Sequence, residues 1–201
     1  MNELTFPSDM VTAINGNMGT TEFDSLRKQW MERSYTDMKV IWGAAEIGEE
    51  AFSYSSLTEA LIPPSVTKIG NNAFDGCAKL NRIVIPEGVT YIRGISVNCD
   101  ALKKIELPEG LVTIDDWTLY GNPLPKLVIP STVETIGNNG IYITVATKIY
   151  FKGTPTWLGA NSIQLKSGGD IYVPWSEGEV ANAPWGATSA TIHYNHTYLG
   201  E

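Results

Sequence analysis

The sequence predicts a solenoid of short parallel β-strands that stack about every 22 residues, with little helix apart from a capping helix near the N-terminus. Four prolines, Pro86, Pro108, Pro130 and Pro174, lie 22, 22 and 44 residues apart, and an apolar–variable–apolar triplet precedes each one. Columns of similar residues recur at the same interval around these prolines. A repeat of about 20–29 residues is typical of solenoids, in which stacking completes a core that no single coil could bury.

Each triplet is predicted to form one short strand of a parallel sheet. The triplets are too short for helices and alternate with period two, and a proline directly after a strand ends it. Ile149-Tyr150-Phe151 fills the 44-residue gap, with Lys152 where the other coils have proline. The remaining triplets are Ile83-Val84-Ile85, Ile105-Glu106-Leu107, Leu127-Val128-Ile129 and Ile171-Tyr172-Val173.

The interior of the solenoid is predicted from four rows of residues at equivalent places in successive coils. A row of small residues stands beside a row of large ones, which suits an interdigitated core. The rows are Val66, Val89, Leu111 and Val133; Ile47, Ile69, Ile92, Ile114, Ile136 and Leu158; Ala51, Ala73, Ser96, Thr118, Gly140 and Ser162; and Phe52, Phe74, Val97, Leu119, Ile141 and Ile163.

The two cysteines, Cys77 and Cys99, occupy equivalent positions on adjacent coils. Stacked strands lie about 4.8 Å apart, so a disulfide between the two is sterically conceivable. A free cysteine packs as a small hydrophobe, and we favour two buried, reduced thiols.

The stretch from Ile62 to Leu80 reads IPPSVTKIGNNAFDGCAKL. It resembles the BspA-type leucine-rich repeat, whose pattern is roughly Ile-x-Ile-Pro-x-x-Val-x-x-Ile-Gly-x-x-Ala-Phe-x-x-Cys-x-x-Leu. The resemblance covers about Ile47 to Pro174 and implies a leucine-rich-repeat solenoid. Because this family consists largely of exported bacterial surface proteins, it also implies a role in adhesion or binding at the cell surface. The start of the chain, Met1 to Pro7, shows no secretory signal.

We predict three parts: an N-terminal segment with a capping helix (1–38), the solenoid (39–174) and a C-terminal cap with a final strand (175–201). In the first part, Thr20 or Thr21 can cap a helix that runs to about Thr36. We interpret this helix as a lid over the first coil, and the alternative is a helix that docks to a partner. One face of the helix carries Phe23, Leu26 and Trp30, with Met31 as a further candidate.

In the C-terminal cap, Ile192 and Tyr194 follow Ile171 and Val173 by 21 residues, which predicts the final strand. Trp175 and Trp185 are expected to seal the end of the core. A second interpretation makes these two tryptophans a stacking platform for sugar rings. The segment from Tyr172 to Asn195 also resembles endings of repeat proteins encoded in bacteriophage and prophage tail regions.

Composition and motifs argue against several classes of function. The net charge of −8 is opposite to what generic nucleic-acid binding requires, and no apolar run reaches the roughly 20 residues of a membrane helix. No nucleophile elbow, phosphate-binding loop or paired-cysteine metal signature occurs. The only histidines, His193 and His196, fall where a strand rather than a helix is expected, so they are not predicted to bind a metal. We therefore expect no enzyme activity, catalytic residue, cofactor or metal.

The clearest indication of a function in the sequence is a pair of columns of residues on the outside of the predicted sheet. One column is basic, and the adjoining column is mostly apolar and includes two tyrosines. An exposed apolar strip of this kind is commonly a contact site, although basic residues can also simply protect a sheet from aggregation. The basic column is Arg82, Lys104, Lys126 and Lys148, and the adjoining column is Leu61, Val84, Glu106, Val128, Tyr150 and Tyr172.

These columns lead to two hypotheses. The first is a non-enzymatic binding or adhesion module that presents this sheet face to a protein or an anionic polysaccharide, with no nucleic-acid binding and no membrane insertion. The second is a structural subunit of a larger assembly, such as a phage virion or tail, in which the N-terminal segment docks to neighbours.

Overall fold

The computed structural model describes residues 4–5, 40–41, 46–62, 64–181 and 183–200. Near the N-terminus, β1 (Leu4–Thr5) and β2 (Val40–Ile41) form a parallel pair. The helix predicted from Thr20 or Thr21 to Thr36 lies outside the described residues. The domain boundaries at 38/39 and 174/175 stay predictions.

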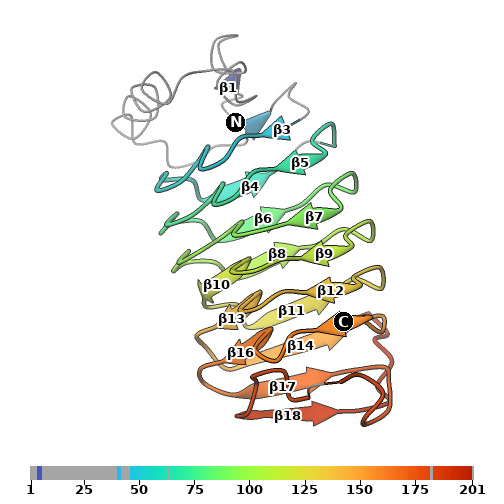
Figure 1. Cartoon of the computed structure of the whole chain (residues 1–201). Coiled ribbons are helices and arrows are strands. Elements are labelled where there is room, and N and C mark those ends of the chain that lie inside the picture. The colour runs from blue at the N-terminus through green and yellow to red at the C-terminus, as the bar shows by residue number, and fades with distance from the viewer. Residues whose placement is uncertain (1–3, 6–39, 42–45, 63, 182, 201) are drawn as a thin grey trace.

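The described chain winds into a solenoid whose strands stack in three columns (Figure 1). The first column supplies the outer surface that we call the strand face. It consists of β4 (Glu59–Leu61), β6 (Arg82–Val84), β8 (Lys104–Glu106), β11 (Lys126–Ile129), β14 (Thr147–Phe151), β17 (Gly169–Tyr172) and β18 (Ala190–His193).

The other two columns are made of shorter strands that close each coil. The second contains β3 (Glu46–Ile47), β5 (Lys68–Ile69), β7 (Tyr91–Ile92), β9 (Thr113–Ile114), β12 (Thr135–Ile136) and β15 (Trp157–Leu158). The third contains β10 (Leu119–Asn122), β13 (Ile141–Ile143) and β16 (Ile163–Leu165).

Strand pairing confirms that the 22-residue interval is one turn of the solenoid. All pairs are parallel, and Ile83 of β6 lies opposite Ile105 of β8. Further along, Leu127, Ile149 and Ile171 are matched on β11, β14 and β17. The shorter final step of 21 residues places Ile192 of β18 opposite Ile171, so a strand does form where the sequence predicted the last one.

The strand face comprises two hydrogen-bonded sheets, β4-β6-β8 and β11-β14-β17-β18. Strands β8 and β11 contact each other at the junction between the sheets. Pro125 directly precedes β11 and has no N–H, so it removes one backbone donor at this junction.

The core follows the predicted rows except at Val97, which was expected among the large interior residues but is half-buried, whereas Ile95 of the same coil is 0% exposed. Val66, Val89, Leu111 and Val133 are at most 2% exposed. Phe52 and Phe74, from the row of large residues, stack with their ring centroids 5.5 Å apart. Equivalent residues therefore pack against one another from coil to coil, as the columns predicted.

Cys77 and Cys99 are buried free thiols, which confirms the favoured prediction over a disulfide. The Sγ atoms of Cys77 and Cys99 lie 3.0 Å from the carbonyl oxygens of Phe52 and Phe74, respectively, and each donates a hydrogen bond to the preceding coil. Hydrogen bonding to Cys77, together with burial, raises the pKa of the Cys99 thiol above its ordinary value. Both sulfurs act as part of the core.

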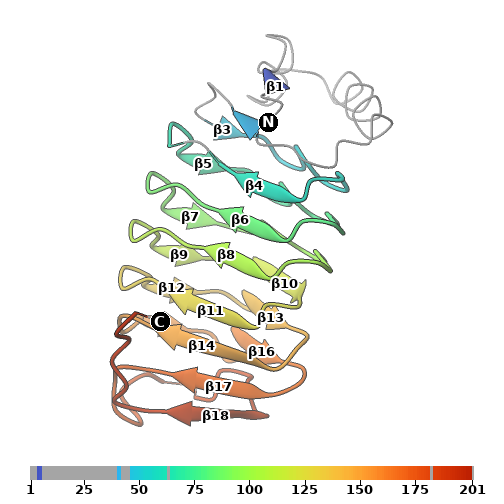
Figure 2. The ribbon, with the colours of Figure 1, turned by 180° about the vertical axis from the view of Figure 1, so that it is seen from behind.

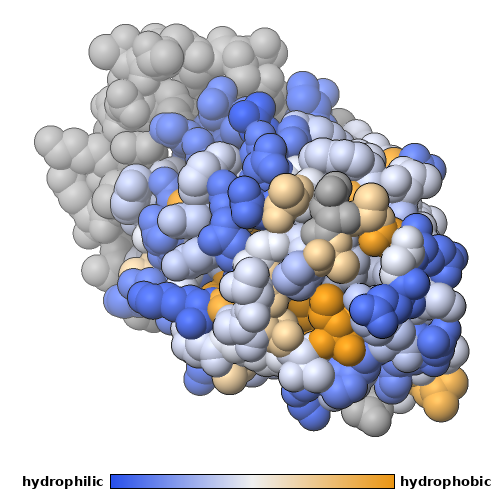
Figure 3. Space-filling view, turned by 60° about the horizontal axis from the view of Figure 1, so that its bottom comes forward, coloured by the Kyte–Doolittle hydropathy of each residue, from blue (hydrophilic) through white to orange (hydrophobic). Residues whose placement is uncertain are grey.

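Trp175 and Trp185 close the C-terminal end of the core. They are 2% and 0% exposed, and their rings meet edge to face at 6.0 Å. Because neither ring presents a face to solvent, the interpretation of these two residues as a sugar-stacking platform is wrong. Viewed from this end, the surface is largely hydrophilic around a central group of apolar side chains (Figure 3).

After β18 the chain turns back along the stack to the level of β14 (Figures 1 and 2). Backbone hydrogen bonds from Asn195 to the Trp175 carbonyl and from His196 to the Val173 carbonyl fix the start of this return. We call residues 194–200 the C-terminal tail. In the part of the chain that the structure describes, no helix has the length and apolar character needed to cross a membrane.

Candidate binding face

The predicted basic column exists as a physical row on the strand face. Arg82 lies opposite Lys104 in β6 and β8, and Lys126 lies opposite Lys148 in β11 and β14. Side chains alternate between the two faces of a strand, so the buried isoleucine or leucine that follows each of these cations leaves the cation itself on the outside. Glu59 continues the row at one end and Asp170 at the other.

An acidic side chain between the first two cations partly neutralises the row. The Oε1 atom of Glu106 lies 2.6 Å from Nη2 of Arg82 and 3.1 Å from Nζ of Lys104. The hydrogen bond from Arg82, supported by Lys104, holds the pKa of Glu106 below its ordinary value. Glu106 is therefore ionised at neutral pH and orients both cations.

The adjoining column is in register as predicted, but its exposure differs from the expectation at one residue. Val84, Val128 and Tyr172 are half-buried, whereas Tyr150 is only 7% exposed. The prediction of an exposed Tyr150 is thus wrong. Its cause is the C-terminal tail, which brings the ring of Tyr198 to 5.3 Å from the ring of Tyr150.

The tail is held by aromatic and cation–π contacts. Nζ of Lys126 lies 5.3 Å from the ring centroid of Tyr150 and 5.6 Å from that of Tyr198, distances at which a cation is attracted to an aromatic ring. Nζ of Lys152 lies 6.0 Å from the ring centroid of Tyr198. The ring of His196 lies 4.7 Å from that of Tyr172. The tail therefore covers part of the face that the sequence predicted to be open.

A stack of parallel rings lies beneath the tail. The ring centroids of Tyr150 and Tyr172 are 4.6 Å apart and the ring planes are nearly parallel, at 7°, and His193 continues the stack with its ring centroid 4.5 Å from that of Tyr172. Nε2 of His193 also lies 2.8 Å from Oδ1 of Asp170. Sequence reasoning missed His193 as a member of this column, although its 21-residue distance from Tyr172 matches the step to the final strand.

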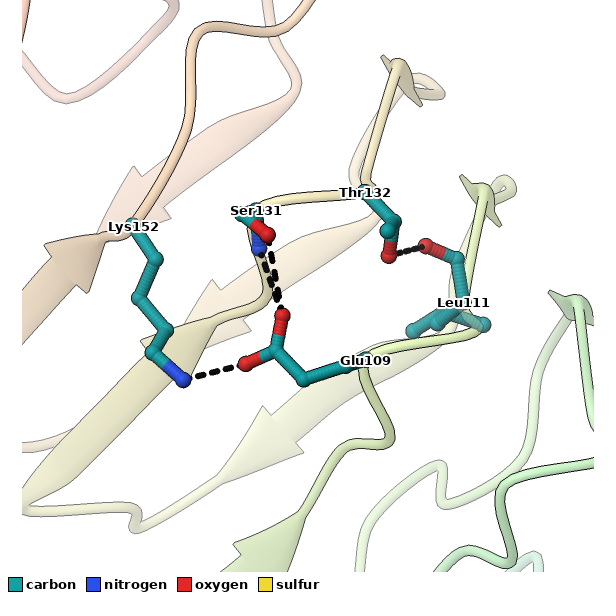
Figure 4. Close-up of polar contacts among 5 residues, drawn as sticks. All are labelled: Glu109, Leu111, Ser131, Thr132 and Lys152. Atoms are coloured by element: carbon teal, nitrogen blue, oxygen red, sulfur yellow. Dashed lines mark hydrogen bonds and ion pairs between the residues drawn. The ribbon is translucent and has the colours of Figure 1, made fainter.

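Hydrogen bonds and an ion pair between coils hold the turns that follow the strands (Figure 4). Oε2 of Glu109 accepts hydrogen bonds from the backbone N–H and the hydroxyl of Ser131, at 3.2 and 3.0 Å. Its other oxygen pairs with Lys152, the residue that replaces proline, and this hydrogen bond lowers the pKa of Glu109. Thr132 donates a hydrogen bond to the carbonyl of Leu111 at 2.7 Å. Lys152 is thereby held near the tail.

The accessible part of the candidate face is therefore narrower than predicted. Lys104 and Lys148 are exposed, and Arg82 and Lys126 are half-buried beside Val84 and Val128. This arrangement places cations next to small apolar surfaces, which suits contact with a larger molecule. Within the described residues, no group of three or more histidine, cysteine or acidic side chains is placed to hold a metal ion.

A comparison with solved structures finds proteins to which this chain is similar. A leucine-rich repeat protein from Bacteroides ovatus is 19% identical, with a TM-score of 0.48, and the match covers 81% of this chain and 60% of that protein. The pneumococcal vaccine antigen PcpA is 14% identical, with a TM-score of 0.46, and the match covers 81% of this chain and 45% of the antigen. A leucine-rich cell surface protein from Faecalibacterium prausnitzii is 15% identical, with a TM-score of 0.30, and the match covers 81% of this chain and 86% of that protein. The chain thus spans less than two thirds of the first two proteins.

A comparison with curated proteins finds no match. A family model does match, with six copies of the BspA-type leucine-rich repeat between residues 34 and 166. This range contains the core rows, the basic column and the strand face as far as β14. The chain therefore belongs to the BspA-type leucine-rich repeat family.

Proposed function

We propose that the chain is a non-enzymatic binding module that presents its strand face to an anionic macromolecule. Proteins of this family are typically surface repeat proteins in binding or adhesion, and their solenoids are typically non-catalytic. The observation that carries the proposal is two in-register pairs of cations on the strand face, Arg82 with Lys104 and Lys126 with Lys148, in a protein whose net charge is −8.

The supporting chemistry is a combination of charge and packing. Lys104 and Lys148 reach solvent, where they can pair with carboxylates or sulfates, while Val84 and Val128 supply apolar contact beside them. Glu106 offsets part of the positive charge of the strand face. The remaining charges are therefore expected to orient the bound partner more than to raise its affinity. An acidic protein surface and an anionic polysaccharide share the negative charge that this face would recognise.

The test is binding to dextran sulfate, a soluble polyanion, measured by calorimetry at increasing salt. We expect the wild-type chain to bind and its affinity to fall as salt rises, because exposed charges are screened. Reversing both exposed cations (K104E with K148E) should weaken binding roughly tenfold, since attraction at two points becomes repulsion.

A charge-matched control separates the strand face from net charge. Lys68 lies on β5 in the second column and Lys166 follows β16 in the third, and both are exposed. The K68E and K166E pair should bind as the wild type does. Equal weakening by both double variants, or no wild-type binding at low salt, would contradict the proposal.

A further inference from the structure

The third column of strands carries a row of three aromatic side chains that the proposed function does not use. Trp117 precedes β10, Tyr120 lies within β10, and Tyr142 lies opposite Tyr120 on β13. The rings of Trp117 and Tyr120 are 4.8 Å apart and tilted by 58°, and those of Tyr120 and Tyr142 are stacked at 4.6 Å. We call these three residues the aromatic row.

Trp117 occupies a backbone position that is costly for its type. Four coils have a positive φ three residues after the isoleucine row, with values of 53° at Glu50, 56° at Asn72, 58° at Trp117 and 53° at Asn139. Asparagine tolerates this left-handed conformation, whereas a bulky side chain adopts it rarely. Trp117 is also 46% exposed, so burial of its indole is far from complete. A strained and exposed aromatic residue is more typical of a binding site than of a core.

A β-bulge in β10 determines how the aromatic row is presented. Tyr120 pairs with Tyr142, but Asn122 rather than Gly121 pairs with Ile143, and Gly121 has a φ of 78°. The bulge turns the amide of Asn122 into the core, where it accepts from the N–H of Cys99 at 3.0 Å and donates to the carbonyl of Ser96 at 2.6 Å. Bulges commonly re-aim side chains next to functional sites.

The row continues into uncharged polar groups. Gln164 of β16 lies opposite Tyr142, and its amide donates a hydrogen bond to the Oδ1 atom of Asn139. The indole of Trp117 is therefore followed by the phenol hydroxyls of Tyr120 and Tyr142, and then by the side-chain amides of Asn139 and Gln164. Asp115 and Asp116 directly precede Trp117, and both are half-buried. Their negative charge disfavours an anionic ligand at the indole.

We propose that the aromatic row binds a neutral saccharide. A pyranose ring presents an apolar C–H face that can stack on the indole of Trp117 and hydroxyl groups that can hydrogen-bond to phenols and amides. The side chains of Tyr120, Tyr142 and Gln164 are themselves uncharged and carboxylates lie beside Trp117, which together favour an uncharged sugar over an anionic one. This site lies on a different face from the strand face, so it stands independently of the proposed function.

The test measures binding of the full chain to three soluble neutral polysaccharides, a mixed-linkage β-glucan, a mannan and a xylan, by quenching of tryptophan fluorescence and by calorimetry. We expect at least one to bind. Trp117→Asn installs the residue that Asn139 supplies one coil later, so the variant should keep its backbone and an equal or higher melting temperature. Its affinity should fall about tenfold or more, as the loss of a central aromatic anchor commonly causes.

Two controls make the outcome decisive. Trp157 is 47% exposed on β15 in another column, and Trp157→Ala should bind as the wild type does. The K104E and K148E pair should also retain saccharide binding, which distinguishes this site from the strand face. Failure of all three polysaccharides to bind, or full binding by a folded Trp117→Asn variant, would overturn the proposal.

Discussion

At the scale of single residues, the two thiols show how the repeat determines chemistry. Cys77 and Cys99 are each 0% exposed, and their sulfurs bond to carbonyls of the preceding coil. We expect neither thiol of the native chain to react with Ellman's reagent within minutes and both to react after denaturation without reductant. Rapid reaction of the folded chain, or fewer than two thiols in the denatured one, would show that this packing is wrong.

Gly169 is a second residue whose identity the fold restricts, because the position has no room for a side chain. Its φ is 147°, and an added Cβ would lie 2.1 Å from the carbonyl oxygen of Thr147 in the neighbouring coil. Gly169→Ala should therefore lower the free energy of unfolding by about 2 kcal/mol or more, measured by urea denaturation. Gly178 is the matched control, because its φ is 84° and nothing lies within 4 Å of an added Cβ. Equal losses in the two variants would attribute the effect to φ alone.

At the scale of elements, the C-terminal tail accounts for the burial of Tyr150. Removing the ring above it by Tyr198→Ala should raise the rate at which Tyr150 is nitrated, because the phenol becomes accessible. Mass spectrometry of the modified peptide measures that rate. Leu199 is 89% exposed, so Leu199→Ala should leave the rate unchanged. An unchanged rate in Tyr198→Ala would mean that the tail does not cover this ring.

The ion pairs between coils predict how stability depends on pH. The pKa values of Glu106 and Glu109 are both lowered, chiefly by hydrogen bonds from Arg82 and Lys152. A carboxyl whose pKa is lowered in the folded state stabilises the protein above its unfolded pKa, and this contribution is lost as pH falls through the folded value. Because these carboxylates are 40% and 48% exposed, each contribution is below about 1 kcal/mol.

Urea denaturation at two pH values tests this dependence. Glu106→Gln together with Glu109→Gln should be less stable than the wild type at pH 7. The difference should shrink at pH 3, because that pH lies below the ordinary pKa of a glutamate in the unfolded chain, where the stabilisation from a lowered folded pKa is being lost. A difference of the same size at both pH values would show that the carboxylates act through packing rather than charge.

At the scale of the whole molecule, the sequence was sufficient for the solenoid because each coil repeats the same environment. The rows beginning at Val66 and Ile47 and the strands at Ile83 and Ile105 could be located from spacing alone. The period also predicted which residues become neighbours in space. For the same reason the basic column can be located from the spacing of its residues in the sequence.

What the sequence could not predict lies where the repeat is broken. The C-terminal tail follows no period, so nothing in the spacing indicated that Tyr198 covers Tyr150. The tryptophans of the cap are an exception, because Trp175 and Trp185 were expected to seal the end of the core and both are buried. The aromatic row was overlooked, although Tyr120 and Tyr142 are separated by one full turn and could have been aligned as a column.

The most direct test of the central claim, that the strand face is the binding surface, is a lysine footprint. The chain, free and saturated with dextran sulfate, is acetylated briefly, and each lysine is quantified by mass spectrometry. If the strand face binds, acetylation of Lys104 and Lys148 should be slower in the complex, with Lys68 and Lys166 unchanged. Protection of Lys68 and Lys166 with no change at Lys104 and Lys148 would contradict it.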